Sequence, residues 1–347
     1  MRCPAPVTPP PNKPKNNRGM ALIMIVFMIA LASAVLISLS ESTYLAMRLN
    51  AAAEQRIKAE YILKSAVNVA RVLIKNDITP SYDDPIQDVW MMFSEGREVP
   101  GSLLGIPDPN VRVSLLITSA NGKLPVNMVN NGSWSQALLS LLKTLGFDQP
   151  LPMNEARDGS PLSSPEELIA NLIDYIDSDT DNFTPNAIIT KPGIEADLPN
   201  GQQFPNSGTI LSLTNELPGI PGLSPARIQR LLPFITDRRI NAINVNAASA
   251  EVITSVFQDP TAASKIEACR DPAQSGGPIQ GSDDLTNRCG VSVAGSTVSI
   301  DYKGDHFDVI AKVEYGTATF MASAQLQSAG TGAGGGRYPN IKSLQLY

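Results

Sequence analysis

A run of uncharged residues near the N-terminus, from Met20 to Leu39, constrains the fold of this chain more than any other feature. A helix of about 20 apolar residues crosses the ~30 Å hydrocarbon core of a membrane, so the run predicts one transmembrane helix. Lys13, Lys15 and Arg18 precede the run, and such positive flanks stay in the cytoplasm. We therefore expect a single-pass protein whose N-terminus is cytoplasmic and whose C-terminal bulk lies across the membrane.

The helix is expected to continue well past the membrane. From Glu41 to Asn76 the chain lacks Pro and Gly and is rich in strong helix formers, so we predict one helix over residues 20–76. At 1.5 Å per residue its length is roughly 85 Å. Its second half carries one apolar stripe, which predicts packing against a sheet, with a dimeric coiled coil as the alternative. The stripe residues recur at three- and four-residue spacing: Ala59, Leu63, Ala66, Val67, Ala70 and Ile74.

Strand patterns lie on both sides of a helical region. Residues 111–117 are rich in β-branched side chains, and Asn121-Gly122 after them predicts a hairpin into a return strand over 123–127. Residues 341–347 predict a final edge strand after a Gly-rich linker over 328–336. Three strands are expected before that linker, with a turn at Gly316 between the last two: residues 297–302, 306–315 and 317–326.

Between these strands, signals for the beginning of a helix recur. Ser133 predicts the cap of a helix over 134–145 that ends at Gly146. The fold class that follows is α+β, with a long N-terminal helix packed on a small antiparallel sheet and a large inserted α-helical domain. Three further helices are expected after their caps: Ser164 before a helix to Ile176, Ser224 before 226–234, and Ala248 or Ser249 before 251–257.

The expected organisation has five parts, assigned from these patterns. A Pro-rich leader covers residues 1–19, and the long helix covers 20–76, of which 20–39 cross the membrane. The rest of the chain is divided between a small α/β head and the insertion: 77–127 for the first part of the head, 128–296 for the inserted helical domain, and 297–347 for the final strands and the linker.

The cysteines predict one disulfide. Cys3 lies ahead of the span, which leaves Cys269 and Cys289 in a compartment that permits disulfides. A bond between them would close a loop of roughly 20 residues and stabilise the fold by about 3 kcal/mol. Two separate buried thiols are the alternative.

The densest group of potential metal ligands lies between Asp174 and Asn182, where four aspartates occur within eight residues. Their mutual repulsion favours a cation, and Ca²⁺ takes six to eight oxygen ligands. The segment is not an EF-hand, because the sixth position counted from Asp177 is Asn182 rather than Gly and the twelfth is Ile188 rather than Glu. An acidic helix end whose aspartates cap turns is the alternative.

Two segments, 213–224 and 243–252, are similar to helix-hairpin-helix DNA-binding modules, whose glycine-bearing hairpin binds a phosphate. Gly219 and Gly222 are spaced one residue wider than is usual there. The net charge of −6 argues against a nucleic-acid partner, since such binding depends on clustered basic side chains. Packing and capping, with Asn244 and Asn246 satisfying backbone groups, are therefore favoured over phosphate contacts from the nearby arginines: Arg227, Arg230, Arg238 and Arg239.

Catalysis is not expected. His306 is the only histidine, and the sequence lacks a Gly-x-Ser-x-Gly motif, a P-loop and metal-hydrolase spacing. A zinc site is not expected either, because one histidine and two disulfide-bonded cysteines do not provide a set of nitrogen and sulfur ligands. These features favour a structural or binding protein over an enzyme.

Several landmarks together resemble the type II secretion protein K family of minor pseudopilins. Gly19 follows Arg18 directly before the apolar run, as at a prepilin peptidase site, and the long helix follows it. In mature numbering the fifth residue is Met24, where most pseudopilins carry a glutamate and K subunits do not. Further landmarks follow in the family's order: the acidic segment from Asp174, then Gly193 to Asp197, the Glu216-Leu217 segment with its following glycine, and Asn244-Val245-Asn246 opening a helix.

The resemblance implies cleavage by prepilin peptidase after Gly19, N-methylation of Met20, and a pilin-like fold with an inserted helical domain that is SAM-like or helix-hairpin-helix-like. It implies a protein of the bacterial inner membrane with a periplasmic C-terminal domain, at the pseudopilus tip with minor pseudopilins I and J and, through them, the other pseudopilins. The alternatives are a type IV minor pilin and a membrane-anchored DNA-uptake protein. The calcium ligands that it implies are Asp177, Asp179 and Glu195, with Asp174, Asp181 and Asp197 as additional ones.

Overall fold

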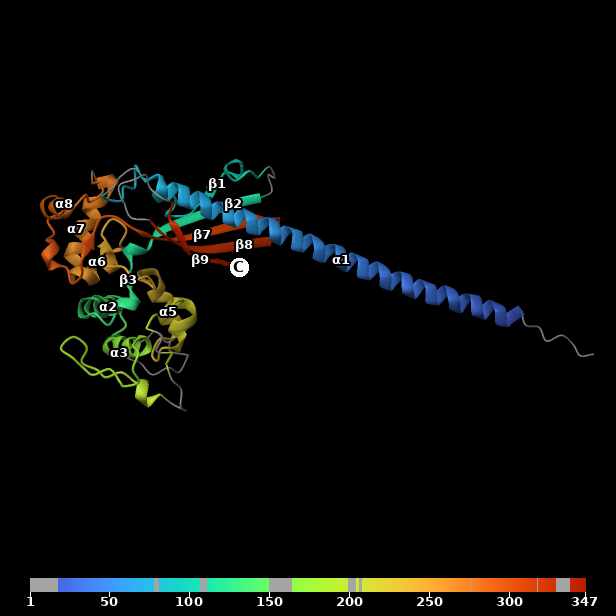
Figure 1. The fold of residues 1–347 in the computed structure, drawn as a ribbon, viewed down its shortest axis with the longest axis horizontal. Helices are drawn as coiled ribbons and strands as arrows, with labels where there is room; N and C mark the ends of the chain where they lie inside the picture. Colours follow the sequence, from blue (N-terminus) through green and yellow to red (C-terminus); the bar gives the residue numbers. More distant parts are fainter. Residues whose placement is uncertain are drawn as a thin grey trace, which may run out of the picture. The chain divides into compact units, whose positions relative to one another are not determined.

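The structure is a computed structural model that describes residues 18–77, 81–106, 111–149, 164–198, 204–205, 208–274, 276–316, 318–328 and 338–347. The chain forms two compact units, Met1–Lys58 and Ala59–Tyr347, and helix α1 (Arg18–Lys75) belongs to both (Figure 1). Residues 1–17 of the leader expected over 1–19, with Cys3, Lys13 and Lys15, lie outside the described residues, as does most of the expected Gly-rich linker, whereas Arg18 and Gly19 begin helix α1.

The first unit is the N-terminal part of α1. From Met20 onwards its large apolar side chains are exposed, and Met24 keeps 67% of its surface. The helix is long and apolar enough to cross a membrane, as judged from its length and composition. Exposed apolar side chains in such number are stable only in a lipid or protein environment, so this part of α1 fits a single-pass anchor.

The second unit begins with the rest of α1, which covers a five-stranded antiparallel sheet in the order β1-β2-β7-β8-β9 (Figure 1). All six residues of the predicted stripe are buried, between 0% and 4% exposed, in one core with the sheet. The stripe is therefore covered within this chain, and the coiled-coil alternative is not needed. The strands are Arg97–Val99 (β1), Val111–Ser119 (β2), His306–Tyr315 (β7), Ala318–Gln327 (β8) and Asn340–Leu346 (β9).

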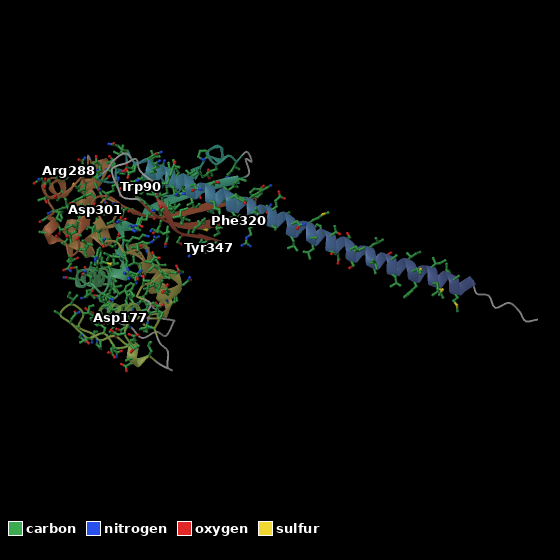
Figure 2. The ribbon with its side chains drawn as sticks, in the orientation of Figure 1. Trp90, Asp177, Arg288, Asp301, Phe320 and Tyr347 are labelled. Atoms are coloured by element: carbon green, nitrogen blue, oxygen red, sulfur yellow. A yellow bond between two sulfur atoms is a disulfide. The ribbon has the colours of Figure 1, made fainter. Side chains whose placement is uncertain are left out.

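Alternation along the strands explains which face α1 covers. In β2, Val113, Leu115 and Ile117 are buried while the residues between them are partly exposed, as expected for a strand with one face in the core. Ile117 pairs with Val309 of β7, so the buried rows of neighbouring strands coincide. Trp90, in the 3₁₀ segment Val89–Phe93 and labelled in Figure 2, adds an edge-to-face contact with Phe307 at 5.0 Å.

The hairpin predicted at Asn121-Gly122 is wrong. Strand β2 pairs with β1 and β7 instead, and Ala120–Gly122 forms a short 3₁₀ turn that leads away from the sheet. Asn121 receives backbone N–H groups from Asp305 and His306 and donates to the Asp305 side chain, and a side chain on Gly122 would overlap with Ala247. Contacts distant in sequence thus determine this turn, whereas the Asn-Gly signal is local.

The expected return strand over 123–127 is correspondingly short. Leu124–Pro125 (β3) pairs in parallel with Ile235–Thr236 (β4), outside the main sheet. Of the strand expected over 297–302, only Ile300–Asp301 (β6) is regular, and it pairs in parallel with Ile243–Asn244 (β5). The strands expected over 306–315, 317–326 and 341–347 are confirmed as β7, β8 and β9, with Gly316 at positive φ between the first two.

The helical block has a hydrophobic core of its own, which extends from Leu124 to Val298. The caps at Ser164, Ser224 and Ser249 are confirmed, but the first helix is capped by Asn131 rather than Ser133, whose N–H the Asn131 side chain accepts. The two helices after Phe257 were not predicted. The helices are Gly132–Thr144 (α2), Pro165–Ile176 (α3), Leu213–Glu216 (α4), Pro225–Leu231 (α5), Ala250–Phe257 (α6), Pro260–Arg270 (α7) and Ser282–Asn287 (α8).

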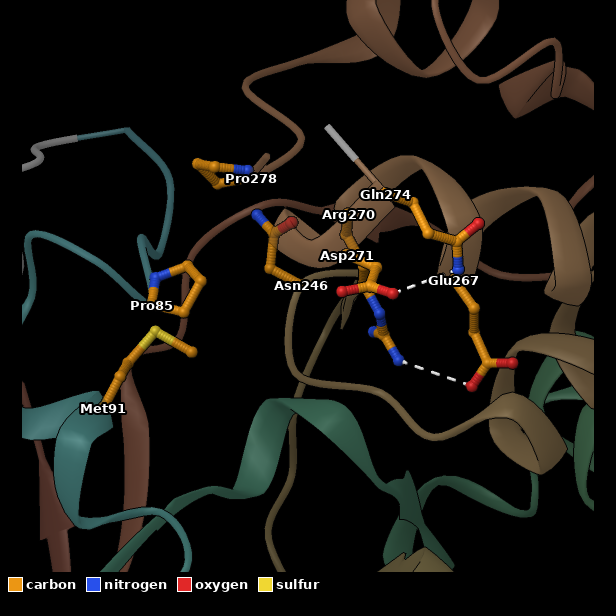
Figure 3. A pocket seen from close by; sticks show the side chains of 8 residues that line it. All are labelled: Pro85, Met91, Asn246, Glu267, Arg270, Asp271, Gln274 and Pro278. Atoms are coloured by element: carbon orange, nitrogen blue, oxygen red, sulfur yellow. Dashed lines mark hydrogen bonds and ion pairs between the residues drawn. The ribbon is translucent and has the colours of Figure 1, made fainter. Parts of the chain in front are cut away.

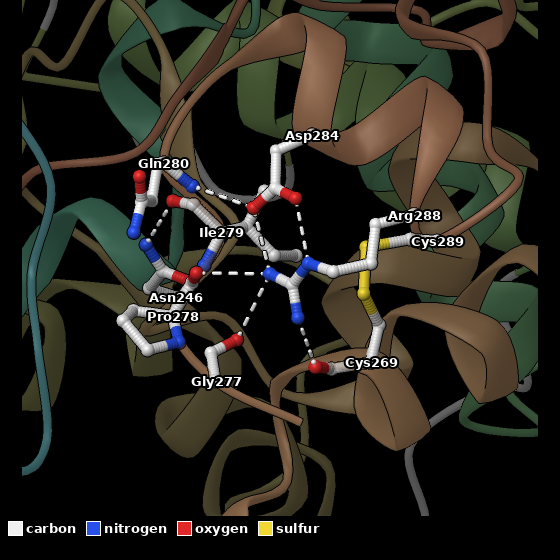
Figure 4. Close-up of a disulfide and its surroundings, with 9 residues drawn as sticks. All are labelled: Asn246, Cys269, Gly277, Pro278, Ile279, Gln280, Asp284, Arg288 and Cys289. Carbon is white, nitrogen blue, oxygen red and sulfur yellow. Dashed lines mark hydrogen bonds and ion pairs between the residues drawn. A yellow bond between two sulfur atoms is a disulfide. The ribbon is translucent and has the colours of Figure 1, made fainter. Parts of the chain in front are cut away.

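A disulfide joins Cys269 of helix α7 to Cys289, two residues past the end of α8, and the two Cα atoms lie 5.4 Å apart (Figure 4). Arg288 lies beside it and bonds both carboxylate oxygens of Asp284, at 2.6 and 2.7 Å. The same guanidinium donates to the carbonyls of Cys269, Gly277 and Pro278 (Figure 4). One cation therefore satisfies three carbonyls of the loop that the disulfide closes.

Candidate functional site

The acidic segment begins where helix α3 ends. A capping box fixes the start of this helix: Ser164 accepts the N–H of Glu167, and the Glu167 carboxylate accepts the N–H of Ser164. Ten of its twelve residues are buried, so its position in the core is well defined. Asp177 is the residue at its C-terminal boundary and is labelled in Figure 2. A rigid helix end therefore presents the first carboxylates of the segment.

Asp174 organises the loop that follows, because its fully buried carboxylate accepts three backbone N–H groups. One oxygen accepts from Phe183 at 2.7 Å, and the other accepts from Ile194 at 2.8 Å and Glu195 at 3.1 Å. A Cβ atom on Gly193 would overlap with this carboxylate, so only glycine fits there. Burial raises the pKa of Asp174 and the three hydrogen bonds oppose the rise. The hydrogen bonds from Ile194 and Glu195 bring residues 194–195 next to the end of α3.

Three carboxylates meet at this point. Asp177, Asp179 and Glu195 each offer an oxygen, and these oxygens lie within 4.8 Å of one another. The Oδ1 atom of Asp177 is buried and has no hydrogen-bond partner among the described residues. Burial, followed by the charges of Asp179, Glu195 and Asp174, raises the pKa of Asp177 to about 7. A hard cation would relieve both the repulsion and the unsatisfied oxygen, so the donors present fit Ca²⁺.

The other three residues expected as ligands are not part of this group. The carboxylate of Asp174 already accepts three backbone N–H groups. Asp181 is exposed, and its N–H donates to Asp179 Oδ1 at 3.0 Å. Asp197 accepts from the Asn182 side chain at 2.7 Å, and Asn182 also accepts the N–H of Ala196. The role of Asn182 as a bridge between the two loop segments was not predicted, because it depends on a fold-level contact that the sequence pattern does not contain.

The arginines near the hairpin-like segment are bonded within the protein. Buried Arg227 donates to the carbonyl of Gly222 at 3.0 Å and lies over the Phe147 ring, and Arg230 donates to the carbonyl of Leu145. Arg238 donates to the carboxylates of Asp237 and Asp308 near the sheet. Arg239 donates to the carbonyl of Gly208 in a neighbouring loop. These contacts do not favour phosphate binding by this segment.

A pocket of about 550 Å³ lies between the 85–91 segment and the end of α7 (Figure 3). Arg270 reaches toward it but donates to the carbonyls of Val245 and Ala248, both at 2.7 Å. Asp271 accepts from Gln274 at 3.0 Å (Figure 3). The polar groups around this pocket are largely bonded to one another, and its rim is completed by apolar Pro85, Met91 and Pro278.

Of the comparisons with known proteins, the one with solved structures finds matches. No protein family model and no curated protein sequence matches the chain. Among solved structures, a chain from the crystal structure of the GspK-GspI-GspJ complex of the enterotoxigenic Escherichia coli type 2 secretion system matches with a TM-score of 0.57. The match covers 85% of this chain and 97% of that chain at 13% sequence identity. The expected α+β fold, pilin-like with additional helices, is therefore confirmed as the fold that this protein shares with a subunit of that complex.

Proposed function

We propose that this protein is a minor pseudopilin of a type II secretion system and that it acts as the K-type subunit at the tip of the pseudopilus. The observation that carries the proposal is the fold match, which includes the helical block as well as the pilin-like part because it covers 85% of the chain. A type IV minor pilin would be expected to lack that block. The exposed apolar part of α1 supplies the anchor that a pseudopilin needs before assembly.

The tip position is supported by Met24. In a pseudopilus, a glutamate at the fifth mature position would neutralise the terminal amine of the subunit ahead, since an unpaired charge in an apolar environment is costly. A subunit at the tip has no other subunit ahead of it and therefore no such amine to neutralise. An apolar Met24 suits that place, and the bulk of the helical block suits a subunit that no other subunit covers.

Processing and partners follow from the same proposal. Prepilin peptidase would cut after Gly19 and leave Met20 as the N-methylated first residue of the mature protein. The matched chain comes from the crystal structure of a GspK-GspI-GspJ complex, which supports minor pseudopilins I and J from this protein's own organism as direct partners. Assembly would place residues 20–39 among the helices of neighbouring subunits, where their exposed apolar side chains would be covered.

Calcium at Asp177, Asp179 and Glu195 is the structural part of the proposal. The ion would join the end of α3 to the 194–195 segment and so complete a loop that Asp174 already holds from one side. Three carboxylates of the described residues are grouped there, so further ligands would be second carboxylate oxygens, backbone carbonyls or water. The ion would act by ordering the block, with no catalytic step.

Copurification tests the proposal. The full-length chain, coexpressed with minor pseudopilins I and J and extracted in detergent, is expected to elute with both as one ternary peak. Chelator, or the double variant Asp177→Asn with Asp179→Asn, should weaken the peak. The matched control Asp181→Asn, which removes an exposed charge of the same segment, should not. A chain that elutes alone with and without Ca²⁺ would contradict the assignment as a K-type subunit.

A further inference from the structure

A second group of carboxylates lies at the other end of the second unit, just after helix α1. Asp77, Asp83 and Asp88 each offer an oxygen, and these atoms lie within 4.8 Å of one another. Asp83 and Asp88 are fully buried, and the side chain of Asp77 is 7% exposed. None of the three belongs to the acidic segment of the sequence. They lie within twelve residues of one another in the sequence, and the fold brings their carboxylates into one group.

Asp83 has one satisfied oxygen and one unsatisfied oxygen. Its Oδ2 atom accepts from Asn244 at 2.5 Å and from the N–H of Gly304 at 3.0 Å. Its Oδ1 atom is buried and has no hydrogen-bond partner among the described residues. The nearby Oγ atom of Ser119 is also buried and has no hydrogen-bond partner among the described residues. A Cβ atom on Gly304 would touch both Ser119 Oγ and Asp83 Oδ2, so these two oxygens border the same small space.

Negative charge exceeds positive charge around this space among the described residues. The ammonium of Lys303 lies 2.7 Å from Asp77, and burial together with a hydrogen bond to Asp88 raises the pKa of Asp77 to about 6. When all three carboxylates are ionised, this one ammonium leaves two negative charges. Asp84, the next acidic neighbour, uses its own carboxylate for the N–H groups of Ile86 and Gln87. Burying an uncompensated charge is costly, and burial raises the pKa of Asp83 to about 7. A divalent cation would supply the missing charge.

We propose that Asp77, Asp83 and Asp88 form a second calcium site, with Ser119 Oγ as a neighbouring hydroxyl ligand. Oxygens on opposite sides of a Ca²⁺ ion are about 4.6 to 5.2 Å apart, because each lies about 2.3 to 2.6 Å from the ion. The three carboxylate oxygens lie within 4.8 Å of one another, which is close enough for them to share one such ion.

A pocket of about 440 Å³ lies beside the group. Lys303 and Gly304 line it, and these two residues contact Asp77 and Asp83. The pocket therefore adjoins the group through these two residues.

The ion would stabilise a junction in the fold. Asp77 lies two residues after the end of α1, Asp83 is bonded to Asn244 of the helical block, and Gly304 leads into strand β7. Binding would therefore join the helix end, the block and the sheet in one coordination shell. This inference does not rest on the secretion role or on the site at Asp177, so each can fail without the others.

Calcium titration of the full-length protein in detergent tests the second site. In the variant Asp177→Asn with Asp179→Asn, isothermal titration calorimetry is expected to detect one remaining Ca²⁺ per chain. Adding Asp83→Asn and Asp88→Asn should abolish that binding. Asparagine at position 83 can still accept from Asn244 and Gly304, so the fold is expected to persist. The matched control Asp301→Asn removes an exposed aspartate of strand β6 and should leave the stoichiometry unchanged.

Two results would overturn the proposal. One is the absence of any calcium heat in Asp177→Asn with Asp179→Asn, which needs no substitution in the second group. The other is an unchanged stoichiometry after Asp83→Asn and Asp88→Asn, as expected if the carboxylates share protons rather than a cation. Thermal unfolding adds an independent reading: Ca²⁺ should raise the Tm of Asp177→Asn with Asp179→Asn by about 2 °C or more, and should not raise it once Asp83 and Asp88 are also replaced.

Discussion

Arg238 of the helical block and Asp308 of strand β7 form an ion pair at 3.0 Å, across a gap of 70 residues in the sequence. The guanidinium also bonds Asp237 at 3.1 Å, and Asp237 accepts from Gln325 of strand β8 at 3.2 Å. The side chain of Arg238 is only 9% exposed. This network is one of the direct polar links between the block and the pilin-like sheet.

Replacement of Arg238 is expected to destabilise that link. Arg238→Met keeps the length of the side chain but removes the guanidinium from Asp237 and leaves Asp308 with the more distant ammonium of Lys123, at 3.9 Å. The free energy of unfolding should therefore fall by about 1 to 2 kcal/mol, a moderate value because Asp308 is partly exposed. Urea unfolding would measure it. Lys312→Met, which breaks an exposed pair with Glu314, is the matched control and should cost less than about 0.5 kcal/mol. Equal losses in both variants would contradict the assigned role of Arg238.

Gly193→Ala is expected to disturb the acidic loop. A methyl group there would overlap with the buried Asp174 carboxylate, which must then release one or more of its three backbone hydrogen bonds. We expect a loss of about 2 to 3 kcal/mol in urea unfolding, together with weaker calcium binding. Gly277→Ala is the control, since a methyl group at position 277 meets no atom within 4 Å. Wild-type behaviour of Gly193→Ala would show that Asp174 does not hold the loop in this way.

Without calcium, the stability of the protein should depend on pH in an unusual direction. The pKa of Asp83 and of Asp177 is raised to about 7, mainly by burial, whereas unfolded aspartate titrates near pH 4. The folded state therefore binds more protons between about pH 4 and pH 7, and the contribution of these groups to stability falls as pH rises through that window. Urea unfolding at pH 5 and pH 8 in chelator measures the change.

The variant Asp83→Asn provides the control for this pH effect. Because asparagine does not titrate, the fall in stability from pH 5 to pH 8 should be smaller in the variant than in the wild type. An equal fall in both proteins would show that Asp83 does not carry the raised pKa.

Met24→Glu tests the tip position. A K-type subunit with no subunit ahead of it should tolerate a glutamate there, so the ternary complex with minor pseudopilins I and J is expected to form at near wild-type yield. Copurification from detergent extracts measures it. Leu63→Glu, which buries a charge in the contact between α1 and the sheet, is the control that should fail. Complete loss of the complex in Met24→Glu would count against the tip position.

Local patterns predicted much of the fold. The apolar run, the stripe on α1 and the caps at Ser164, Ser224 and Ser249 all act over a few residues, and all are present in the structure. The failures are of another kind. The turn at Asn121-Gly122 depends on Asp305 and Ala247, which are distant in sequence, and helix α7 has too weak an apolar periodicity to be recognised.

The candidate sites divide in the same way. Asp177 and Asp179 are neighbours in sequence, so their pattern was visible, and Glu195 was named through the family resemblance. Asp174 and Asp197 are kept out of the carboxylate group because Asp174 bonds the backbone and Asp197 bonds Asn182. These contacts arise only when the loop folds back. The group of Asp77, Asp83 and Asp88 carries no repeated spacing, so the sequence gives no reason to separate it from the other acids of an acidic protein.

Three of the six stripe residues on α1 are alanines, namely Ala59, Ala66 and Ala70, and each is fully buried against the sheet. A helix that presents methyl groups lies close to its partner layer, and this closeness leaves no volume for a larger side chain. The sequences of relatives should therefore diverge less on the buried face of the helix than on its exposed face. Among distant relatives the three positions are expected to stay small, while exposed neighbours such as Tyr61 and Val72 change freely or follow the surface of an assembly partner.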